Sequence, residues 1–286
     1  MKISFIGLGI MGKPMAFNLL KEQSLDVVYN RTSSKTAEFQ EAGVDVARSP
    51  KEAAEKSDVI LTMLADSSDV EEVILGTNGV IEGVKRGSIV IDMSSINPEV
   101  SKKIGLPLQE KEVSLLDAPV SGGEKGAIEG TLAIMVGGDE KVLNSVRPIL
   151  NIVGSSIARV GDLGAGGYAK LANQIMVALH LEAMSEAFLL AKKADLDFNK
   201  LYKAIRGGLA GSHVLEQKID NLIEEDFNPG FKIDLHLKDL NNALKVAESQ
   251  GIDLPFTKNI QKSMEEMAEQ GYGDLDHSSL YKYLTE

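Results

Sequence analysis

Short apolar runs alternate with segments of helical periodicity over the first half of the chain. The apolar runs predict buried strands at 2–6, 26–30, 58–64, 88–93, 113–117 and 131–136. Between them, apolar residues recur at helical spacing and predict helices such as 11–21, 50–57 and 68–75. Because strands alternate with helices, we expect βαβ units and a parallel sheet that is covered on both faces.

The pattern changes near Val160. From Gly164 onward it is helical and contains no convincing strand. Helices are predicted at 165–194, 197–207, 213–224, 235–250, 256–270 and 277–284. A length of 286 residues also suggests about two domains. We therefore predict an α/β domain over residues 1–162 and an all-α domain over residues 163–286.

The first strand is followed by a glycine-rich turn that opens a helix. The turn has the pattern G-x-G-x-x-G and consists of Gly7, Leu8, Gly9, Ile10, Met11 and Gly12. In this context Gly7 makes the tight turn, Gly9 lets the backbone approach a pyrophosphate, and Gly12 permits close packing of helix on strand. The helix N-terminus favours the phosphate charge. The pattern predicts a Rossmann-type, dinucleotide-binding domain; the alternative is a glycine-rich turn without a ligand.

The end of the second strand bears on which dinucleotide binds. NAD-specific sites carry Asp or Glu there, about 20 residues after the glycines, to bind the ribose 2′-hydroxyl. This chain instead has the neutral residue Asn30, followed by Arg31, Thr32, Ser33 and Lys35. Arginine suits a phosphate, and hydroxyls can donate to one. We expect NADP(H) to be preferred, with NAD(H) possible; the alternative is a solvated polar loop with N-cap residues.

Further candidate residues follow the ends of other strands, where ligands bind in open α/β sheets. Three segments should converge there: Met63, Leu64 and Ala65; Ser94 and Ser95; and residues 117–123. In the last segment Ser121 offers a hydroxyl, and Gly122 and Gly123 offer backbone N–H groups in a conformation that glycine tolerates. Such a backbone nest can hold a carboxylate. The alternative is a loop that merely turns.

A lysine interrupts the apolar start of the helix predicted at 165–194. Lys170 shares a helix face with Asn173 and Gln174, at i+3 and i+4, just past the predicted domain boundary. We therefore expect these three side chains to lie over the crevice. A charged lysine can polarise a carbonyl and donate a proton to the alkoxide that hydride transfer leaves. The alternative is a structural lysine whose charged end reaches solvent from an apolar face.

Composition and charge exclude several other functions. A formal net charge of −12 argues against nucleic-acid and anionic-membrane partners, and it requires local positive charge wherever an anion binds. The chain has no cysteine and only four histidines, so we expect no disulfide and no metal site. We find no run of roughly 18 apolar residues and no secretory signal, so we predict a cytoplasmic protein without a membrane span.

Five motifs in a fixed order resemble those of the β-hydroxyacid dehydrogenase family. They are GLGIMG, DMSS, DAPVSGG, GAGGYAKLANQ and FKIDLHLKDL, and together they cover the whole chain. The resemblance implies a Rossmann domain joined by a long helix to an all-α domain that forms dimers or tetramers. It also implies roles for residues: Lys170 as catalytic acid/base, Ser121, Gly122 and Gly123 at the substrate carboxylate, Asn173 in the substrate site, and Ser95 and Lys238 at the cofactor.

Within that family, AIRGGLAGSHVL, PGFKIDLHLKDLNNAL and DHSSL resemble members that reduce tartronate semialdehyde (2-hydroxy-3-oxopropanoate) to D-glycerate. The small, polar stretch 207–213 favours a hydroxylated substrate. The alternatives are 3-hydroxyisobutyrate, succinic semialdehyde or glyoxylate as substrate, and a non-catalytic NADP-binding scaffold. His213 and His236 could be interpreted as catalytic, but for His236 we favour a supporting or interface role.

Overall fold

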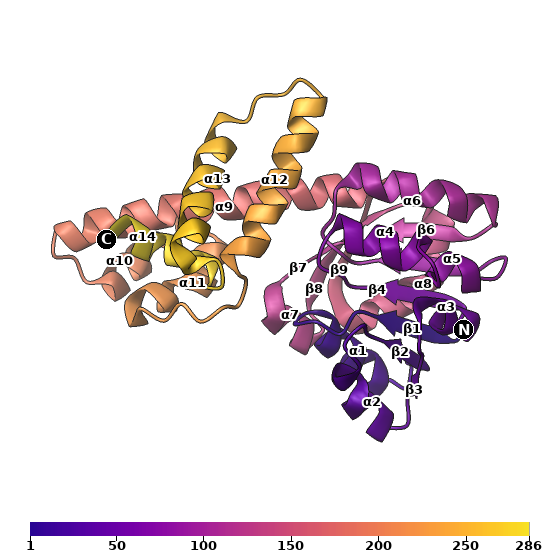
Figure 1. Ribbon diagram of the computed structural model, residues 1–286. Coiled ribbons are helices and arrows are strands. Elements are labelled where there is room, and N and C mark those ends of the chain that lie inside the picture. Colours follow the sequence, from indigo (N-terminus) through magenta and orange to yellow (C-terminus); the bar gives the residue numbers. More distant parts are fainter. Residues whose placement is uncertain (286) are drawn as a thin grey trace. The chain divides into compact units, whose positions relative to one another are not determined.

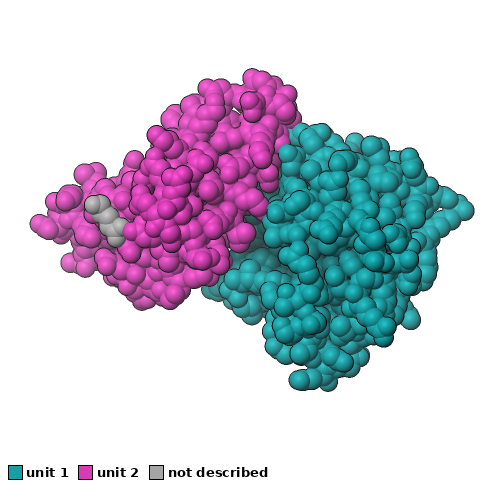
Figure 2. All heavy atoms as spheres, viewed as in Figure 1, with its two compact units in different colours: residues 1–170 teal, residues 171–286 magenta. Residues whose placement is uncertain are grey.

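The computed structural model describes residues 1–285 and divides into two compact units (Figures 1 and 2). The first unit is Met1–Lys170 and the second is Leu171–Glu286. The division falls inside a helix, α9 (Ala165–Lys193), which runs through both units. The predicted domain boundary at 162/163 lies just before this helix and remains a prediction.

A mixed sheet forms the centre of the first unit. Its strands follow the order β3-β2-β1-β4-β5-β6-β8-β7, with β9 paired to β8. The strands are β1 (Ile3–Ile6), β2 (Val27–Tyr29), β3 (Asp45–Val46), β4 (Val59–Thr62), β5 (Ile89–Asp92), β6 (Ser114–Asp117), β7 (Val120–Ser121), β8 (Leu132–Gly137) and β9 (Gly154–Gly161). From β3 to β6 all neighbours are parallel, in the order of a Rossmann fold. The predicted α/β Rossmann-type fold is confirmed.

One part of the sheet differs from the prediction of an all-parallel arrangement. Strand β8 runs antiparallel to both β6 and β7. Residues 122–131 connect β7 to β8, and a connection of ten residues is too short for a parallel crossover, which needs about a dozen or more. The strands β3, β7 and β9 were not predicted, because β3 and β7 have two residues each and most of β9 is exposed.

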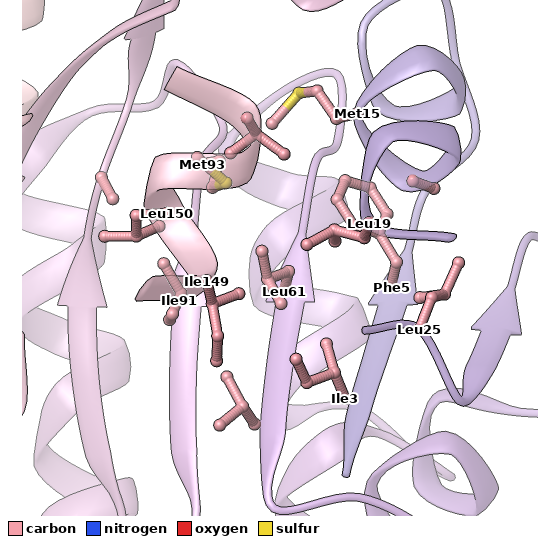
Figure 3. Packing of buried hydrophobic residues seen from close by; sticks show 14 of the residues in the cluster. Ile3, Phe5, Met15, Leu19, Leu25, Leu61, Ile91, Met93, Ile149 and Leu150 are labelled. Atoms are coloured by element: carbon pink, nitrogen blue, oxygen red, sulfur yellow. The ribbon is translucent and has the colours of Figure 1, made fainter. Parts of the chain in front are cut away.

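Helices cover both faces of the sheet (Figure 1). They are α1 (Gly12–Lys21), the 3₁₀ helix η1 (Ser33–Thr36), α2 (Ala37–Glu41), α3 (Pro50–Glu55), α4 (Ser67–Leu75), α5 (Val80–Gly83), α6 (Pro98–Glu110), α7 (Gly123–Glu129) and α8 (Glu140–Val153). Alternate residues along each central strand point to opposite faces, and both sets are buried. Ile3 and Phe5 of β1 pack with α1 and α8 (Figure 3), whereas Ile6 packs with α3 and α4 on the other face.

The second unit is helical, as the sequence predicts. It contains most of α9, then α10 (Phe198–Ile205), α11 (His213–Glu224), α12 (Ile233–Ser249), α13 (Pro255–Met267), η2 (Ala268–Tyr272), the 3₁₀ helix η3 (His277–Ser279) and α14 (Leu280–Thr285). These helices share one apolar core, which includes Phe188, Leu240 and Met264. The helix pair α12–α13 packs beside α9 (Figure 1).

Helix α9 is long and apolar, but it is only partly buried. Its 29 residues are long and apolar enough to cross a membrane by length and composition, which the sequence analysis did not anticipate. Only 39% of its most apolar 18-residue window is buried inside the chain. The core helix of a soluble protein can pass the same criterion, so this helix is weak evidence for a membrane span.

Candidate active site

The glycine-rich turn joins β1 to α1. At two of its glycines, Gly7 and Gly12, the surrounding backbone leaves no space for a side chain. Gly7 has a φ of +99°, and a Cβ there would lie 2.2 Å from the carbonyl oxygen of Met63. A Cβ on Gly12 would lie 1.9 Å from the carbonyl oxygen of Gly7. Gly9 differs, because a Cβ there would meet no described atom within 4 Å. Packing within the protein therefore explains Gly7 and Gly12, whereas Gly9 borders open space from which a ligand could closely approach the protein backbone.

Hydrogen bonds tie this turn to the ends of neighbouring strands. The backbone N–H of Leu8 donates to Asn30 Oδ1 over 2.8 Å. The N–H of Leu64 donates to Ser94 Oγ over 2.9 Å, and Ser94 Oγ–H donates to Asp92 Oδ1 over 2.6 Å. The carboxyl ends of β1, β2, β4 and β5 therefore form one braced edge. This edge includes the point between β1 and β4 at which the strand order reverses, where Rossmann folds bind their dinucleotide.

The loop after β2 carries the residues that were predicted to select NADP. The amide of Asn30 braces the glycine turn and also donates to the carbonyl oxygen of Thr32 over 3.0 Å. The side chain of Arg31 is 84% exposed, with a 3.3 Å contact to Asp69. Thr32, Ser33 and Lys35 are also exposed. With Ser34, which is exposed as well, the loop thus presents two cations and three hydroxyls to solvent, next to the braced edge.

Two buried acids end neighbouring strands of the sheet. Asp92 on β5 and Asp117 on β6 are directly opposite each other in the strand register. Asp92 Oδ1 accepts hydrogen bonds from Thr62 and Ser94, but burial raises the pKa of this carboxyl to about 6. Burial also raises the pKa of Asp117. Burial, together with a smaller contribution from the neighbouring Asp117 carboxyl, therefore keeps Asp92 protonated up to a higher pH than a solvated aspartic acid.

Asp117 holds the start of the lysine-bearing helix on the sheet. Its carboxylate accepts the backbone N–H groups of Gly164 over 2.7 Å and of Gly167 over 2.8 Å. A Cβ on Gly166 would lie 2.4 Å from the carbonyl oxygen of Met135, so the helix touches the sheet backbone itself. Lys170 follows about one turn later and is 7% exposed. Asp117 is the first residue of the motif DAPVSGG, but its capping role was not predicted, because the groups that it binds are about 50 residues away in sequence.

The serine–glycine segment has the backbone that was expected of it. Ser121 ends β7, where it pairs with Ala133 of β8, and it is half-buried. Gly122 and Gly123 have φ angles of +138° and +63°, which L side chains rarely adopt. Gly123 is the first residue of α7. The chain therefore turns sharply between the end of β7 and the start of α7.

The remaining candidates form a polar cluster in the helical unit. Gln174 is 3% exposed; its Nε2 donates to Asp239 Oδ2 over 2.7 Å, and its Oε1 accepts from Asn173 over 3.1 Å. Lys238 Nζ lies 3.2 Å from Asp239 Oδ1. Asp239 is 2% exposed and was missed by the sequence analysis, although it directly follows the candidate Lys238.

The candidates thus fall into groups that belong to different parts of the fold. The edge of the sheet carries the glycine turn, the loop at residues 30–35, Met63, Leu64 and Ala65, and half-buried Ser95. Lys170 is on α9 with Asn173 and Gln174, at spacings that align them on one helix face. Within the described residues 1–285, no group of three or more His, Asp or Glu side chains could hold a metal ion.

The sheet order, the braced glycine turn at its reversal point and a buried lysine on the following long helix define a dinucleotide-dependent oxidoreductase. Comparison with family models agrees. Residues 2–161 match the NAD binding domain of 6-phosphogluconate dehydrogenase, and residues 164–284 match the NAD-binding domain of NADP-dependent 3-hydroxyisobutyrate dehydrogenase. The chain belongs to the β-hydroxyacid dehydrogenase family and is an NAD(P)-dependent oxidoreductase of hydroxy acids. The resemblance seen in the motifs is confirmed.

Individual relatives cover nearly the whole chain. A 2-hydroxy-3-oxopropionate reductase of Escherichia coli K12 is 44% identical over 286 residues, which are 99% of this chain and 97% of the relative. A 2-(hydroxymethyl)glutarate dehydrogenase of Eubacterium barkeri is 36% identical over 98% of this chain and 94% of the relative. The structure of Mycobacterium tuberculosis 3-hydroxyisobutyrate dehydrogenase with L-serine superposes with a TM-score of 0.90, at 31% identity over 100% of this chain and 99% of that one.

Proposed function

We propose that the protein reduces tartronate semialdehyde to D-glycerate, with NADPH preferred over NADH. The observation that carries the substrate assignment is the 44% identity, over 99% of this chain, to a protein named 2-hydroxy-3-oxopropionate reductase. Relatives that act on other short hydroxy acids are 36% and 31% identical. The small, polar stretch 207–213 supports a hydroxylated substrate over a methylated one.

Lys170 is the proton donor in this proposal. Bound NAD(P)H supplies the hydride for the carbonyl carbon of the substrate. Lys170 Nζ polarises the carbonyl oxygen and then passes it a proton, so the developing negative charge is neutralised as it forms. Its support is the burial of Lys170 and the anchoring of its helix by Asp117, which together limit the positions the ammonium can take.

The substrate carboxylate is held by Ser121, Gly122 and Gly123 in this proposal. Positive φ angles at both glycines suit a backbone nest, and the Ser121 hydroxyl can add a donor. Asn173 and Gln174 then bind the substrate hydroxyl or orient the ammonium of Lys170. Such placement converts a bimolecular reaction into an effectively intramolecular one.

The preference for NADP(H) follows from the loop after β2. Asn30 carries no charge that would repel a 2′-phosphate, and its amide is already used to brace the turn. Arg31 and Lys35 supply cations, while Thr32 and Ser33 supply hydroxyls, all on an exposed loop. The glycine turn, Met63, Leu64, Ala65, Ser95 and Lys238 complete the cofactor site in this proposal.

A second copy of the chain is the proposed partner. Met176 and Leu190 on α9 are 61% and 72% exposed, and apolar surface of this kind on a helix is usually covered in an oligomer. Light scattering should give a dimer or tetramer, and Leu190→Glu should weaken it. A monomer at working concentration would refute this part.

The deciding experiment is a comparison of substrates by NAD(P)H absorbance. Tartronate semialdehyde with NADPH should give the highest kcat/KM, and succinic semialdehyde, glyoxylate and 3-hydroxyisobutyrate (with NADP⁺) should trail it. If another aldehyde or hydroxy acid is preferred, the substrate assignment is wrong, whereas the family chemistry remains. Comparable kcat/KM values for NADH and NADPH would remove the cofactor preference.

A further inference from the structure

Two buried histidines of the helical unit are used by none of the chemistry above. His236 on α12 is fully buried, and His277, the first residue of η3, is 5% exposed. Their Nδ1 atoms lie 3.0 Å apart. The Nε2 atom of His236 lies 3.1 Å from the backbone carbonyl oxygen of Gln174. The ring of Phe231 meets both imidazoles edge-on.

The contacts of His236 dictate which nitrogens carry protons. A carbonyl oxygen only accepts, so His236 Nε2 must be the N–H that donates to Gln174. A neutral imidazole has one N–H, so Nδ1 of His236 is then an acceptor. The Nδ1 atom of His277 must therefore carry the proton between the two rings. The carbonyl group of Gln174 thus determines the tautomers of both neutral histidines: His236 carries its proton on Nε2, and His277 carries its proton on Nδ1.

The same reasoning identifies where an additional proton can enter. A proton added to Nε2 of His277 preserves the hydrogen bond from His277 to His236 and the hydrogen bond from His236 to the carbonyl oxygen of Gln174. A proton on Nδ1 of His236 would set two N–H groups against each other, unless His277 changed its tautomer. Asp276, next in sequence to His277, also favours a positive charge there. Burial opposes ionisation of Asp276, but the charges of His277 and Lys218 and its hydrogen bonds lower its pKa to about 2.

The ionisable groups joined to this cluster come from three elements. Asp276, which precedes η3, accepts from Lys218 of α11 over 2.8 Å. On α12, Asp239 lies three residues after His236, and its carboxylate accepts a hydrogen bond from the side-chain amide of Gln174. The ammonium of Lys238 forms an ion pair with the same carboxylate. Gln174 is therefore held twice by α12: its carbonyl by His236 and its side chain by Asp239.

We propose that His277 and His236 are positioning residues: His277 donates a hydrogen bond to His236, and His236 donates one to the backbone carbonyl of Gln174. When the pair takes up an additional proton, His277 is the histidine that becomes charged. The chain of bonds sets the position of α12 against α9 at the turn that carries Asn173, and it thereby places Asn173 and Lys238. This inference rests on the proposed function for the roles of those two residues. Lys170 is anchored separately, through Asp117.

Imidazole ¹⁵N NMR of the full-length protein tests the proton assignment without reference to activity. The chain has four histidines, and the exposed His180 and His213 supply reference signals that His180→Gln and His213→Gln identify. We expect His236 protonated at Nε2 and His277 at Nδ1 at high pH, with the next proton on His277. A proton on Nδ1 of neutral His236, or charging of His236 before His277, would overturn the assignment.

Steady-state kinetics test the positioning role. In His277→Leu the donor to His236 is lost, and we expect KM for the aldehyde or NADPH to rise about tenfold with a smaller fall in kcat, because Lys170 keeps its own anchor. In His277→Asn the side-chain amide can restore the donor, so KM should return to within about threefold of the original value. His180→Leu, an exposed histidine of α9, is the matched control and should change neither parameter.

The kinetic results for the His277 variants decide the positioning role, and the activity of the unaltered protein decides the proposed function. An equal or larger fall in kcat, an unchanged KM in His277→Leu, or no recovery in His277→Asn overturns the positioning role. If His277→Leu does not fold, recovery of folding and KM in His277→Asn and the NMR tautomers still decide. If the unaltered protein reduces none of the aldehydes, the proposed function fails, while the NMR result on the pair remains valid.

Discussion

The loop after β2 in the first unit and the polar cluster of the second unit use polar residues in opposite ways. In Met1–Lys170 many candidate cofactor residues lie on loops at the carboxyl ends of strands, and Arg31, Thr32, Ser33 and Lys35 are exposed. In Leu171–Glu286 the notable polar residues are buried: Gln174 and Asp239 are 3% and 2% exposed, and both His236 and His277 are similarly covered. Exposed polar residues are available to a ligand, whereas buried ones must first satisfy each other.

Because of this difference, substitutions at exposed and at buried polar residues should have different consequences. Replacing an exposed loop residue removes a contact to a ligand and leaves the fold intact. Replacing a buried polar residue leaves its partner without a hydrogen bond, which costs folding free energy as well as function. Lys170 is buried and belongs to the proposed site, and Asp117 is buried and anchors the start of the helix that carries it. Substitutions at these positions test the comparison most severely.

The largest effect should come from Lys170→Ala. Losing the proton donor should lower kcat by about 10³-fold, or roughly 4 kcal/mol of transition-state stabilisation. The NAD(P)H absorbance assay measures this, and thermal unfolding shows whether the fold survives. Lys170→Arg is the matched control, since it keeps the charge but releases a proton far less readily, and it should remain severely impaired. Activity of Lys170→Ala above a tenth of the original value would rule out this role.

Next in size is Asp117→Ala, which removes both acceptors at the start of α9. Two buried N–H groups, on Gly164 and Gly167, would lose their partner, so the free energy of unfolding should fall by about 3 kcal/mol. Urea unfolding measures this loss. Asp139→Ala removes an exposed cap from α8 in the same unit and should cost clearly less. Equal losses in the two variants would contradict the anchoring of α9 by Asp117.

Asp92→Asn should change how stability depends on pH. Folding raises the pKa of Asp92 from 3.8 to about 6 through burial, so the folded chain binds this proton more tightly than the unfolded chain does. The contribution of Asp92 to stability is therefore present at low pH and declines as pH rises from about 4 to about 6, by about 3 kcal/mol.

An asparagine at this position mimics the uncharged acid and cannot ionise. The variant should lack that decline, and at pH 8 it should be at least as stable as the original. Urea unfolding at several pH values between 4 and 8 measures the effect. A decline of the same size in Asp92→Asn would assign it to another group.

The smallest of these effects should come from Arg31→Ala on the exposed loop. We expect KM for NADPH to rise about tenfold, while KM for NADH and the unfolding free energy stay unchanged. Arg86→Ala, whose side chain is similarly exposed at 80%, serves as the control and should alter neither KM. A parallel rise in KM for both dinucleotides would show that Arg31 does not recognise a 2′-phosphate.

Local patterns allowed much of the fold to be predicted. The six expected strands and the helices after Gly164 all correspond to elements of the structure, since apolar periodicity reports directly on burial. The helices α6 and α8 were not predicted, and each contains an internal proline, Pro107 and Pro148, which usually interrupts a helix. Strand β9 lacks an apolar run because it lies at the sheet edge and is mostly exposed.

Some residues of the candidate site could likewise be recognised from local sequence patterns, and others could not. Each glycine of the turn and the alignment of Lys170, Asn173 and Gln174 can be recognised from neighbouring residues. Asp239 and His277 could not be recognised, because their partners are distant in sequence. Gln174 and Asp239 are 65 residues apart, and His236 and His277 are 41 apart.

By itself, the sequence determined the alternation of strands and helices, the glycine turn and the helix face that carries the lysine, because each depends on spacing within a few residues. Tertiary structure alone decided that β8 runs antiparallel, that Asp117 caps a helix 47 residues further on, and that one backbone carbonyl sets the tautomers of two histidines. These depend on which groups meet after the chain has folded, and a buried polar group must find its partner wherever the fold places one.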